Sequence, residues 1–183
     1  MNKKKFETSL HRPAVAIATG LLVAMMVAGP MAEAASTGPS GLPLPRYVSL
    51  KASRVNMRVG PGRDYKVDWM YTKRGLPLEI LQEYDNWRKV RDPEGVEGWI
   101  LHSLLSGART AIVAPWKRHE KENHSALRKN PSPTGVTVAR LEAGVLVKVS
   151  QCLDGWCKMS VKGIDGYIEQ ASLWGVYPDE KIE

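Results

Sequence analysis

The sequence predicts an all-β protein that contains two copies of one small β unit, a barrel or a sandwich, in tandem. A turn, a short strand, a tight turn and a second strand span residues 85–100, and the same order returns in residues 154–168. In each copy, a tryptophan after the first turn is followed by another aromatic residue eleven or twelve positions later: Trp87 and Trp99, then Trp156 and Tyr167. Short β-rich segments between Gly, Pro and Asp turns favour the same fold class.

The N-terminus has the three parts of a secretory signal peptide. Residues 3–5 form a basic region, an apolar run covers residues 14–28, and an Ala-x-Ala cleavage site ends at Ala34. We therefore predict that residues 1–34 are a signal peptide and that cleavage between Ala34 and Ala35 releases a periplasmic or secreted protein with no stable membrane span. The alternative is an uncleaved anchor, although the run is shorter than the roughly 20 apolar residues of a span.

The mature chain is mildly basic. Removal of residues 1–34 leaves 22 of the 26 basic and 17 of the 19 acidic residues, a net charge of +5. This balance favours contact with anionic surfaces, and the need for solubility also explains it. The sequence has no dense block of Lys and Arg with interleaved aromatic residues, so we do not expect a nucleic-acid partner.

The first repeat is expected in residues 47–113, after a Gly- and Pro-rich segment, residues 35–46, that we interpret as a flexible linker. Its composition and turn residues predict strands at residues 47–51, 55–59, 65–71, 76–84, 88–91, 97–101 and 110–113. Residues 102–106 are too few for a stable helix and predict one 3₁₀ turn.

The second repeat is expected in residues 126–177, after an interdomain linker in residues 114–125. It aligns with the first repeat, with Leu127 in the place of Met57, but it has lost two glycines and is degenerate. Its strands are predicted at residues 136–140, 145–149, 156–161 and 166–168. Residues 178–183 form a tail that we expect to fray.

Each repeat is too small to bury a large core. A domain of about 60 residues buries only about 60% of the surface of its unfolded chain. We therefore expect the two repeats to pack on each other, with Trp116 or Trp174 in the contact.

Cys152 and Cys157 are the only cysteines, and residues 154–155 between them form an Asp-Gly pair, a strong signal for a two-residue hairpin turn. Such a turn makes the cysteines face each other on neighbouring strands, within the Cα separation that disulfides accept. Because an exported protein meets an oxidising compartment, we predict a disulfide. The valines of residues 145–149 would then face the wrong side unless a bulge lies at residues 150–151. The alternative, a metal or redox site, has no further cysteine to support it.

The first repeat resembles the bacterial SH3 domain family. Residues 55–62, Val-Asn-Met-Arg-Val-Gly-Pro-Gly, are similar to that family's N-[VLM]-R-x-G-P opening, and residues 86–90 and 98–100 are similar to its W-x-K-V and G-W-[VI] strands. The resemblance covers nearly all of residues 47–113. It implies two SH3-like β-barrels and a binding module of the cell envelope that recognises peptide or peptidoglycan. The alternative is a structural or scaffolding protein that recruits another envelope protein through the same surface.

Motifs for catalysis and for metal binding are weak. His119 and His124 are five positions apart, whereas the zinc motif H-E-x-x-H needs four. We find no G-x-S-x-G turn for a nucleophile. Bacterial SH3 domains often accompany cell-wall hydrolases, but two repeats leave no room for a catalytic domain in this chain. We therefore predict a non-enzymatic protein without cofactor, metal or catalytic residues, and keep an enzyme as a third hypothesis.

The predicted ligand surface is centred on Trp87. Side chains alternate along a strand, so the apolar Val90 points into the barrel while Trp87, Lys89 and Arg91 share the outer face. Aromatic residues of the preceding loop are expected beside them, which completes the site: Trp87, Tyr65, Trp69, Tyr71, Lys89 and Arg91. An exposed Trp among cations suits a peptide, or a sugar–peptide polymer, that carries carboxylates. The alternative is that Trp87 caps the core or packs against the other barrel.

Overall fold

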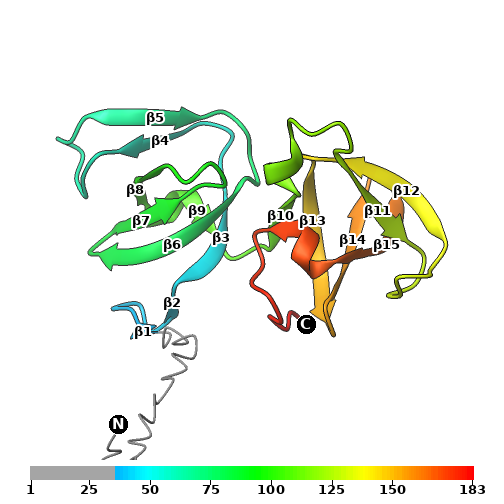
Figure 1. Cartoon of the computed structure of the whole chain (residues 1–183). Helices are drawn as coiled ribbons and strands as arrows, with labels where there is room; N and C mark the ends of the chain where they lie inside the picture. The colour runs from blue at the N-terminus through cyan, green and yellow to red at the C-terminus, as the bar shows by residue number, and fades with distance from the viewer. Residues whose placement is uncertain (1–35) are drawn as a thin grey trace, which may run out of the picture. The chain divides into compact units, whose positions relative to one another are not determined.

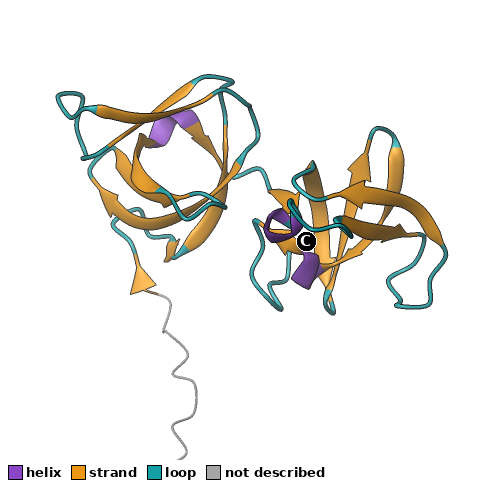
Figure 2. Cartoon of the chain, turned by 45° about the horizontal axis from the view of Figure 1, so that its top comes forward, coloured by secondary structure: helices purple, strands orange, loops and turns teal. Residues whose placement is uncertain are grey.

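The structure, a computed structural model, describes residues 36–183. The predicted signal peptide and its cleavage site between Ala34 and Ala35 lie outside the described residues. The described chain is all-β, with two seven-stranded antiparallel sheets, one two-stranded hairpin and short 3₁₀ turns (Figures 1 and 2). The predicted fold class is thereby confirmed. Within residues 36–183, no helix has the length and apolar character needed to cross a membrane.

The first sheet forms the first barrel. Its strands are β3 (Arg46–Leu50), β4 (Val55–Arg58), β5 (Val67–Tyr71), β6 (Pro77–Tyr84), β7 (Trp87–Arg91), β8 (Glu97–Leu101) and β9 (Leu105–Ser106). They pair in the order β5-β4-β8-β7-β6-β3-β9. The 3₁₀ turn η1 (His102–Leu104) joins β8 to β9, where the sequence predicted a single turn.

The second sheet repeats this arrangement. Its strands are β10 (Thr110–Val113), β11 (His124–Arg128), β12 (Thr137–Glu142), β13 (Leu146–Leu153), β14 (Trp156–Val161), β15 (Ile164–Glu169) and β16 (Leu173–Trp174), with the 3₁₀ turns η2 (Pro115–Lys117) and η3 (Gln170–Ser172). They pair in the order β12-β11-β15-β14-β13-β10-β16, so each strand has a counterpart in the first barrel. The predicted tandem repeat is confirmed.

One strand belongs to a different barrel from the one predicted. We expected residues 110–113 to close the first repeat, but β10 pairs with β13 and β16 of the second sheet. There it holds the place that β3 holds in the first barrel, since β3 pairs with β6 and β9. Strand pairing is a long-range choice that local composition does not encode, which is why the order along the chain was misleading.

Each barrel has its own apolar core. The alternation of side chains sends Met57, Val90 and Ile100 into the first core, and all three are completely buried. Leu127, Met159 and Ile168 are their counterparts in the second core. The inward direction of Val90 agrees with the alternation expected for its strand.

The segment expected to be a linker is ordered against the first barrel. β1 (Ser36–Thr37) pairs with β2 (Pro43–Leu44), and the Leu44 side chain joins the first core. The Glu83 carboxylate accepts hydrogen bonds from the backbone N–H of Ser40 at 2.8 Å and from its hydroxyl at 2.7 Å. The Gly and Pro residues that suggested a linker instead make a tight hairpin, which one carboxylate fixes to the sheet.

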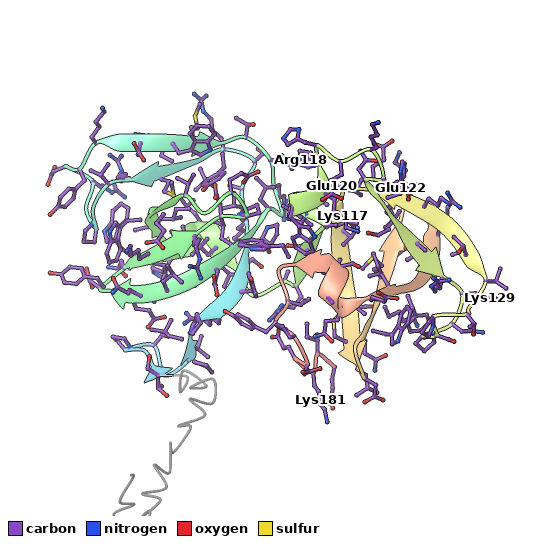
Figure 3. All side chains as sticks on the ribbon, in the orientation of Figure 1. Lys117, Arg118, Glu120, Glu122, Lys129 and Lys181 are labelled. Atoms are coloured by element: carbon purple, nitrogen blue, oxygen red, sulfur yellow. A yellow bond between two sulfur atoms is a disulfide. The ribbon has the colours of Figure 1, made fainter. Side chains whose placement is uncertain are left out.

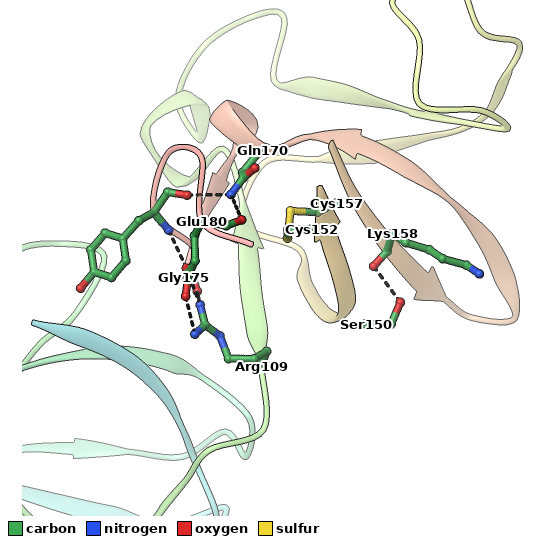
Figure 4. Close-up of a disulfide and its surroundings, with 9 residues drawn as sticks. Arg109, Ser150, Cys152, Cys157, Lys158, Gln170, Gly175 and Glu180 are labelled. Carbon is green, nitrogen blue, oxygen red and sulfur yellow. Dashed lines mark hydrogen bonds and ion pairs between the residues drawn. A yellow bond between two sulfur atoms is a disulfide. The ribbon is translucent and has the colours of Figure 1, made fainter. Parts of the chain in front are cut away.

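The C-terminal tail is also attached, although we expected it to fray. The backbone of Ile182 exchanges two hydrogen bonds with that of Cys152, at 2.9 and 3.0 Å. Glu180 forms an ion pair with Arg109 at 2.8 Å, and the Gln170 amide donates to the carbonyl of Tyr177 at 2.7 Å (Figure 4). Polar residues far away in the sequence therefore fix the position of a tail that its composition alone predicted to be frayed.

The predicted disulfide between Cys152 and Cys157 is present, with the two Cα atoms 4.1 Å apart (Figure 4). The two residues face each other across β13 and β14, and the turn at residues 154–155 has positive φ at both positions. The register shifts between Val149 and Gln151, so the bulge also lies where the alternation of the valines required it.

Contacts between the barrels involve the second of the two expected tryptophans. The ring of Trp174 lies edge-on to that of Tyr47, with centroids 5.1 Å apart, whereas Trp116 is 54% exposed. The hydroxyl of Tyr177 donates to the Glu79 carboxylate at 2.9 Å. Residues 114–125, which we expected to link the barrels, instead begin within the second barrel, because β10 and β11 belong to the same sheet. The segment between these strands is rich in charge, with Lys117, Arg118, Glu120 and Glu122 among its side chains (Figure 3).

Candidate functional site

The outer face of the first barrel carries an aromatic and cationic surface on three adjacent strands. Trp87 of β7 faces Leu101 of β8, and Lys89 faces Trp99 in the next row. Trp99 in turn faces Arg58 of β4. Facing residues of an antiparallel pair project from the same side of the sheet, so the pairing alone brings these side chains together.

Trp87 lines a cavity of about 390 Å³, which we call the Trp87 groove. Its other lining residues are Arg54, Asn56, Arg58, Arg63, Leu101 and Leu104. We expected Trp87 to be exposed on the outer face; it is on that face, but only 9% of it is exposed. Leu101 on the facing strand and Leu104 of η1 line the same cavity, which gives it an apolar side next to its cationic one.

A tight loop positions two of the arginines. Arg58 donates from Nη1 to the carbonyl of Tyr65 at 2.6 Å, which ties the end of β4 to the far side of the loop that contains Arg63. The Tyr65 ring lies directly over Gly60, where an added Cβ would be 2.4 Å from a ring carbon. The Gly-Pro-Gly motif at residues 60–62 therefore serves this packing.

The charge in the Trp87 groove is not balanced. Arg54, Arg58 and Arg63 line it, and no carboxylate does. In the described part of the chain, none of the three forms an ion pair. Guanidinium groups gathered at one site repel one another and present planar donors that match a carboxylate or phosphate. The groove is therefore suited to an anion that has an apolar part beside its charge.

Two of the predicted cations are already paired. Lys89 forms an ion pair with Glu97 at 2.8 Å, and Arg91 forms one with Glu79 at 2.7 Å. Hydrogen bonding with Glu79 raises the pKa of the Arg91 guanidinium further, so it stays charged. Neither side chain lines the Trp87 groove.

The predicted aromatic neighbours lie in different places. Tyr65 is 49% exposed and packs on the loop, while Trp69, 55% exposed, lines a separate cavity with Tyr71 and Pro93. The Tyr71 hydroxyl is buried and donates to Asp92 at 3.1 Å. Burial, followed by the charge of Asp92, raises the pKa of Tyr71 above its ordinary value, so this hydroxyl remains a structural donor.

Sequence reasoning missed the three arginines of the groove. Arg58 is part of the motif that carried the family resemblance, and Arg63 follows the Gly-Pro-Gly turn directly. Both positions were visible as motif residues, but their convergence on Trp87 depends on the pairing of β4 with β8. Among residues 36–183, no three His, Cys, Asp or Glu side chains gather as a metal site.

Fold and site together define a protein of two small barrels, of which the first has an open cationic groove beside a tryptophan. The chain belongs to the bacterial SH3 domain family, which matches residues 51–107 and 121–175. This confirms the resemblance noted from the sequence and extends it to the degenerate second repeat. No curated protein matches the sequence.

Three solved structures show weak likeness. NlpC2 and NlpC1 from Trichomonas vaginalis are 15% and 18% identical, with a TM-score of 0.32 each, over 71% and 76% of this chain and 48% of theirs. An NlpC/P60 family protein from Bacillus cereus is 10% identical, with a TM-score of 0.30, over 70% of this chain and 55% of its own. The chain spans about half the length of these proteins, and their likeness assigns no activity to it.

Proposed function

We propose that the chain is a non-enzymatic, exported binding protein of the cell envelope, and that its Trp87 groove recognises a carboxylate-bearing peptide or peptidoglycan. One observation carries the proposal: three arginines line one cavity together with a tryptophan, and no carboxylate is among the lining residues. A carboxylate would relieve their mutual repulsion, and an adjacent apolar group would pack on Trp87, Leu101 and Leu104.

The proposed location is the periplasm or the cell exterior. The basic, apolar and Ala-x-Ala regions of residues 1–34 support export. The disulfide between Cys152 and Cys157 supports it independently, because such bonds persist in oxidising compartments.

The test measures binding of the mature protein to two tripeptides, one with a free terminal carboxylate and one with a terminal amide, and to purified peptidoglycan. The free carboxylate should bind better, and Arg63→Gln should remove most of that preference. A charged hydrogen bond contributes about 1.5–3 kcal/mol, so roughly a tenfold loss or more is expected. Arg140→Gln, an exposed arginine of β12, is the matched control and should bind normally.

Trp87→Ala should also weaken binding of both carboxylate ligands, with the melting temperature measured alongside. Equal binding of the acid and the amide, unchanged by Arg63→Gln, would contradict the proposal. Failure to bind peptidoglycan together with specific retention of one envelope protein would support the scaffolding alternative instead. Release of labelled fragments from cell wall by the pure protein would restore the enzyme hypothesis.

A further inference from the structure

The second barrel carries the same outward side chains as the first. β6 and β13 have their register shift at equivalent places, so positions in the two sheets correspond one to one. Five positions on the outer face or its hairpin turn hold identical residues in both copies: Arg58 and Arg128, Gln82 and Gln151, Asp85 and Asp154, Trp87 and Trp156, Lys89 and Lys158. A sixth position is aromatic in both, Trp99 and Tyr167.

Packing of the core does not explain this agreement. Core positions have changed between the copies, with Met57 replaced by Leu127 and Val90 by Met159. Gln151 and Lys158, by contrast, are exposed, and polar side chains in solvent are free to vary without cost to the fold. Exposed polar side chains that agree between the copies, where the fold does not require them, favour a binding role for this part of the second barrel.

Five of these six side chains of the second barrel, all but Arg128, line a cavity of about 320 Å³, the Trp156 groove. Its lining residues are Pro131, Gln151, Leu153, Asp154, Trp156, Lys158 and Tyr167. Trp156 faces Glu169, and Tyr167 is two residues before Glu169 on β15, so the two aromatic residues are diagonal neighbours. Diagonal positions lie about 7–8 Å apart, which lets two aromatic side chains contact the same small ring.

The Trp156 groove is not the counterpart of the Trp87 groove, because the tryptophan is the only equivalent position that lines both. The residues equivalent to Arg54, Arg63 and Leu101 are His124, Pro133 and Glu169, and none of them lines the Trp156 groove. Among the lining residues, one carboxylate, Asp154, balances one ammonium group, Lys158. The groove therefore lacks the surplus of cations that would select an anion.

We propose that the Trp156 groove binds a neutral sugar ring of a glycan chain. Hydroxyl groups both donate and accept, and this groove offers an acceptor in Asp154, a donor in Lys158 and both in the Gln151 amide. The apolar face of a sugar ring packs on Trp156 and Tyr167, as is usual for sites that combine aromatic walls with a few polar groups. The proposal deepens the proposed function: the first barrel binds the peptide part of an envelope polymer and the second binds its sugars.

The experiment uses the mature protein and a β-1,4-linked tetramer of N-acetylglucosamine, with binding measured by isothermal titration calorimetry. We expect the wild type to bind the tetramer, Trp156→Ala to lose at least tenfold in affinity, and Trp87→Ala to bind it normally. Gln151→Ala changes an exposed residue and should also lower the affinity for the tetramer. This second variant keeps the test valid if Trp156→Ala unfolds the second barrel. Ser160→Ala, an exposed position of β14 outside the groove, is the control.

Several outcomes would overturn the glycan site. They are no tetramer binding by the wild type, tetramer binding that Trp156→Ala and Gln151→Ala leave unchanged, or a proline-rich peptide that binds at Trp156 in place of the tetramer. The proposed function is judged separately by the acid-against-amide tripeptide pair. Normal discrimination of that pair together with absent tetramer binding would remove the glycan site and leave the Trp87 groove standing.

Discussion

Replacement of Glu83 by Gln should destabilise the first barrel and detach the hairpin formed by β1 and β2. The Glu83 carboxylate accepts hydrogen bonds from the backbone N–H and the hydroxyl of Ser40. It also pairs with Arg46 Nη2 at 2.6 Å and with Arg88 Nε at 3.1 Å. Its side chain is only 1% exposed, so solvent does not screen these contacts.

The size of the effect follows from these contacts. Removing one member of a buried ion pair costs about 3–5 kcal/mol when its partner stays buried. Arg46 and Arg88 keep side-chain exposures of 16% and 12%, so both recover part of their hydration in the variant. We expect Glu83→Gln to lower the free energy of unfolding by about 2–3 kcal/mol.

The stability difference should also depend on pH. Burial raises the pKa of Glu83, but the hydrogen bonds from Ser40 and Arg46 outweigh it and lower the pKa to about 2, from an ordinary value of 4.5. A lowered pKa means that the contribution is complete above pH 4.5 and is lost as the pH falls through about 2. The difference between wild type and variant should therefore be constant near neutral pH and shrink in strong acid.

The assay is urea unfolding at pH 7, followed by tryptophan fluorescence and circular dichroism. Glu97→Gln is the control, because it removes the ion pair with Lys89, whose members are 37% and 31% exposed. Such an exposed pair contributes about 0–1 kcal/mol. Equal unfolding free energies for the two variants would refute the reasoning about Glu83.

Three further outcomes are expected. A thiol assay on the denatured, unreduced native protein should detect no free thiol, since Cys152 and Cys157 are bridged; two thiols per chain would be a contradiction. N-terminal sequencing of the native protein should begin at or near Ala35, and an intact Met1 would exclude cleavage. Gly98→Val should lower the melting temperature, because a Cβ there would be 2.6 Å from the buried Met57 side chain, whereas ligand binding by the fraction that remains folded should persist.

The hairpins and the repeat could be predicted from the sequence because their signals are local. The Asp-Gly pair at residues 154–155 specified the turn, the turn specified the facing cysteines, and the alternation of nearby valines required the bulge. Each step uses residues within a few positions of one another. The side to which Val90 points followed from the same alternation.

Pairings over long distances in sequence could not be predicted in this way. β10 lies between β13 and β16 of the second sheet, and the composition of residues 110–113 does not distinguish this pairing from one with the first sheet. Residues 36–46 are held in place by a hydrogen bond to Glu83, about forty positions away. The tail is held in place by an ion pair with Arg109. Composition indicated turns and fraying ends. It did not indicate that the carboxylate of Glu83 and the guanidinium of Arg109 bond these two segments to the barrels.

In the candidate site, too, the features with local signals could be predicted and those that depend on strand pairing could not. Alternation along β7 placed Trp87 on the outer face, but Leu101 and Leu104, which line the same groove, come from β8 and η1. Lys89 and Arg91 shared the predicted face, yet Glu97 and Glu79 on the two neighbouring strands neutralise them. A sequence pattern shows the direction of a side chain, whereas the charge that remains available depends on neighbours that only strand pairing reveals.

The two barrels join the same pair of facing strand positions by different chemistry. Glu83 faces Arg88 across β6 and β7, and Cys152 faces Cys157 at the equivalent positions of β13 and β14. In both barrels the two residues of this pair lie on either side of the turn and the groove tryptophan, and they are joined by an ion pair in the first barrel and by a disulfide in the second.

The same position also anchors the chain outside the sheet. The Glu83 carboxylate accepts a hydrogen bond from the backbone N–H of Ser40 in the N-terminal hairpin. The backbone of Cys152 forms hydrogen bonds with that of Ile182 in the C-terminal tail. A carboxylate accepts several donors at once, so the ion pair can hold a hairpin that a disulfide could not. The disulfide sulfurs have no such capacity, and there the main chain of β13 bonds the tail instead. In each barrel, a segment near one end of the described chain is therefore attached to the same strand position, in β6 or in β13. Glu83 attaches its segment through the side chain, whereas Cys152 attaches its segment through the backbone.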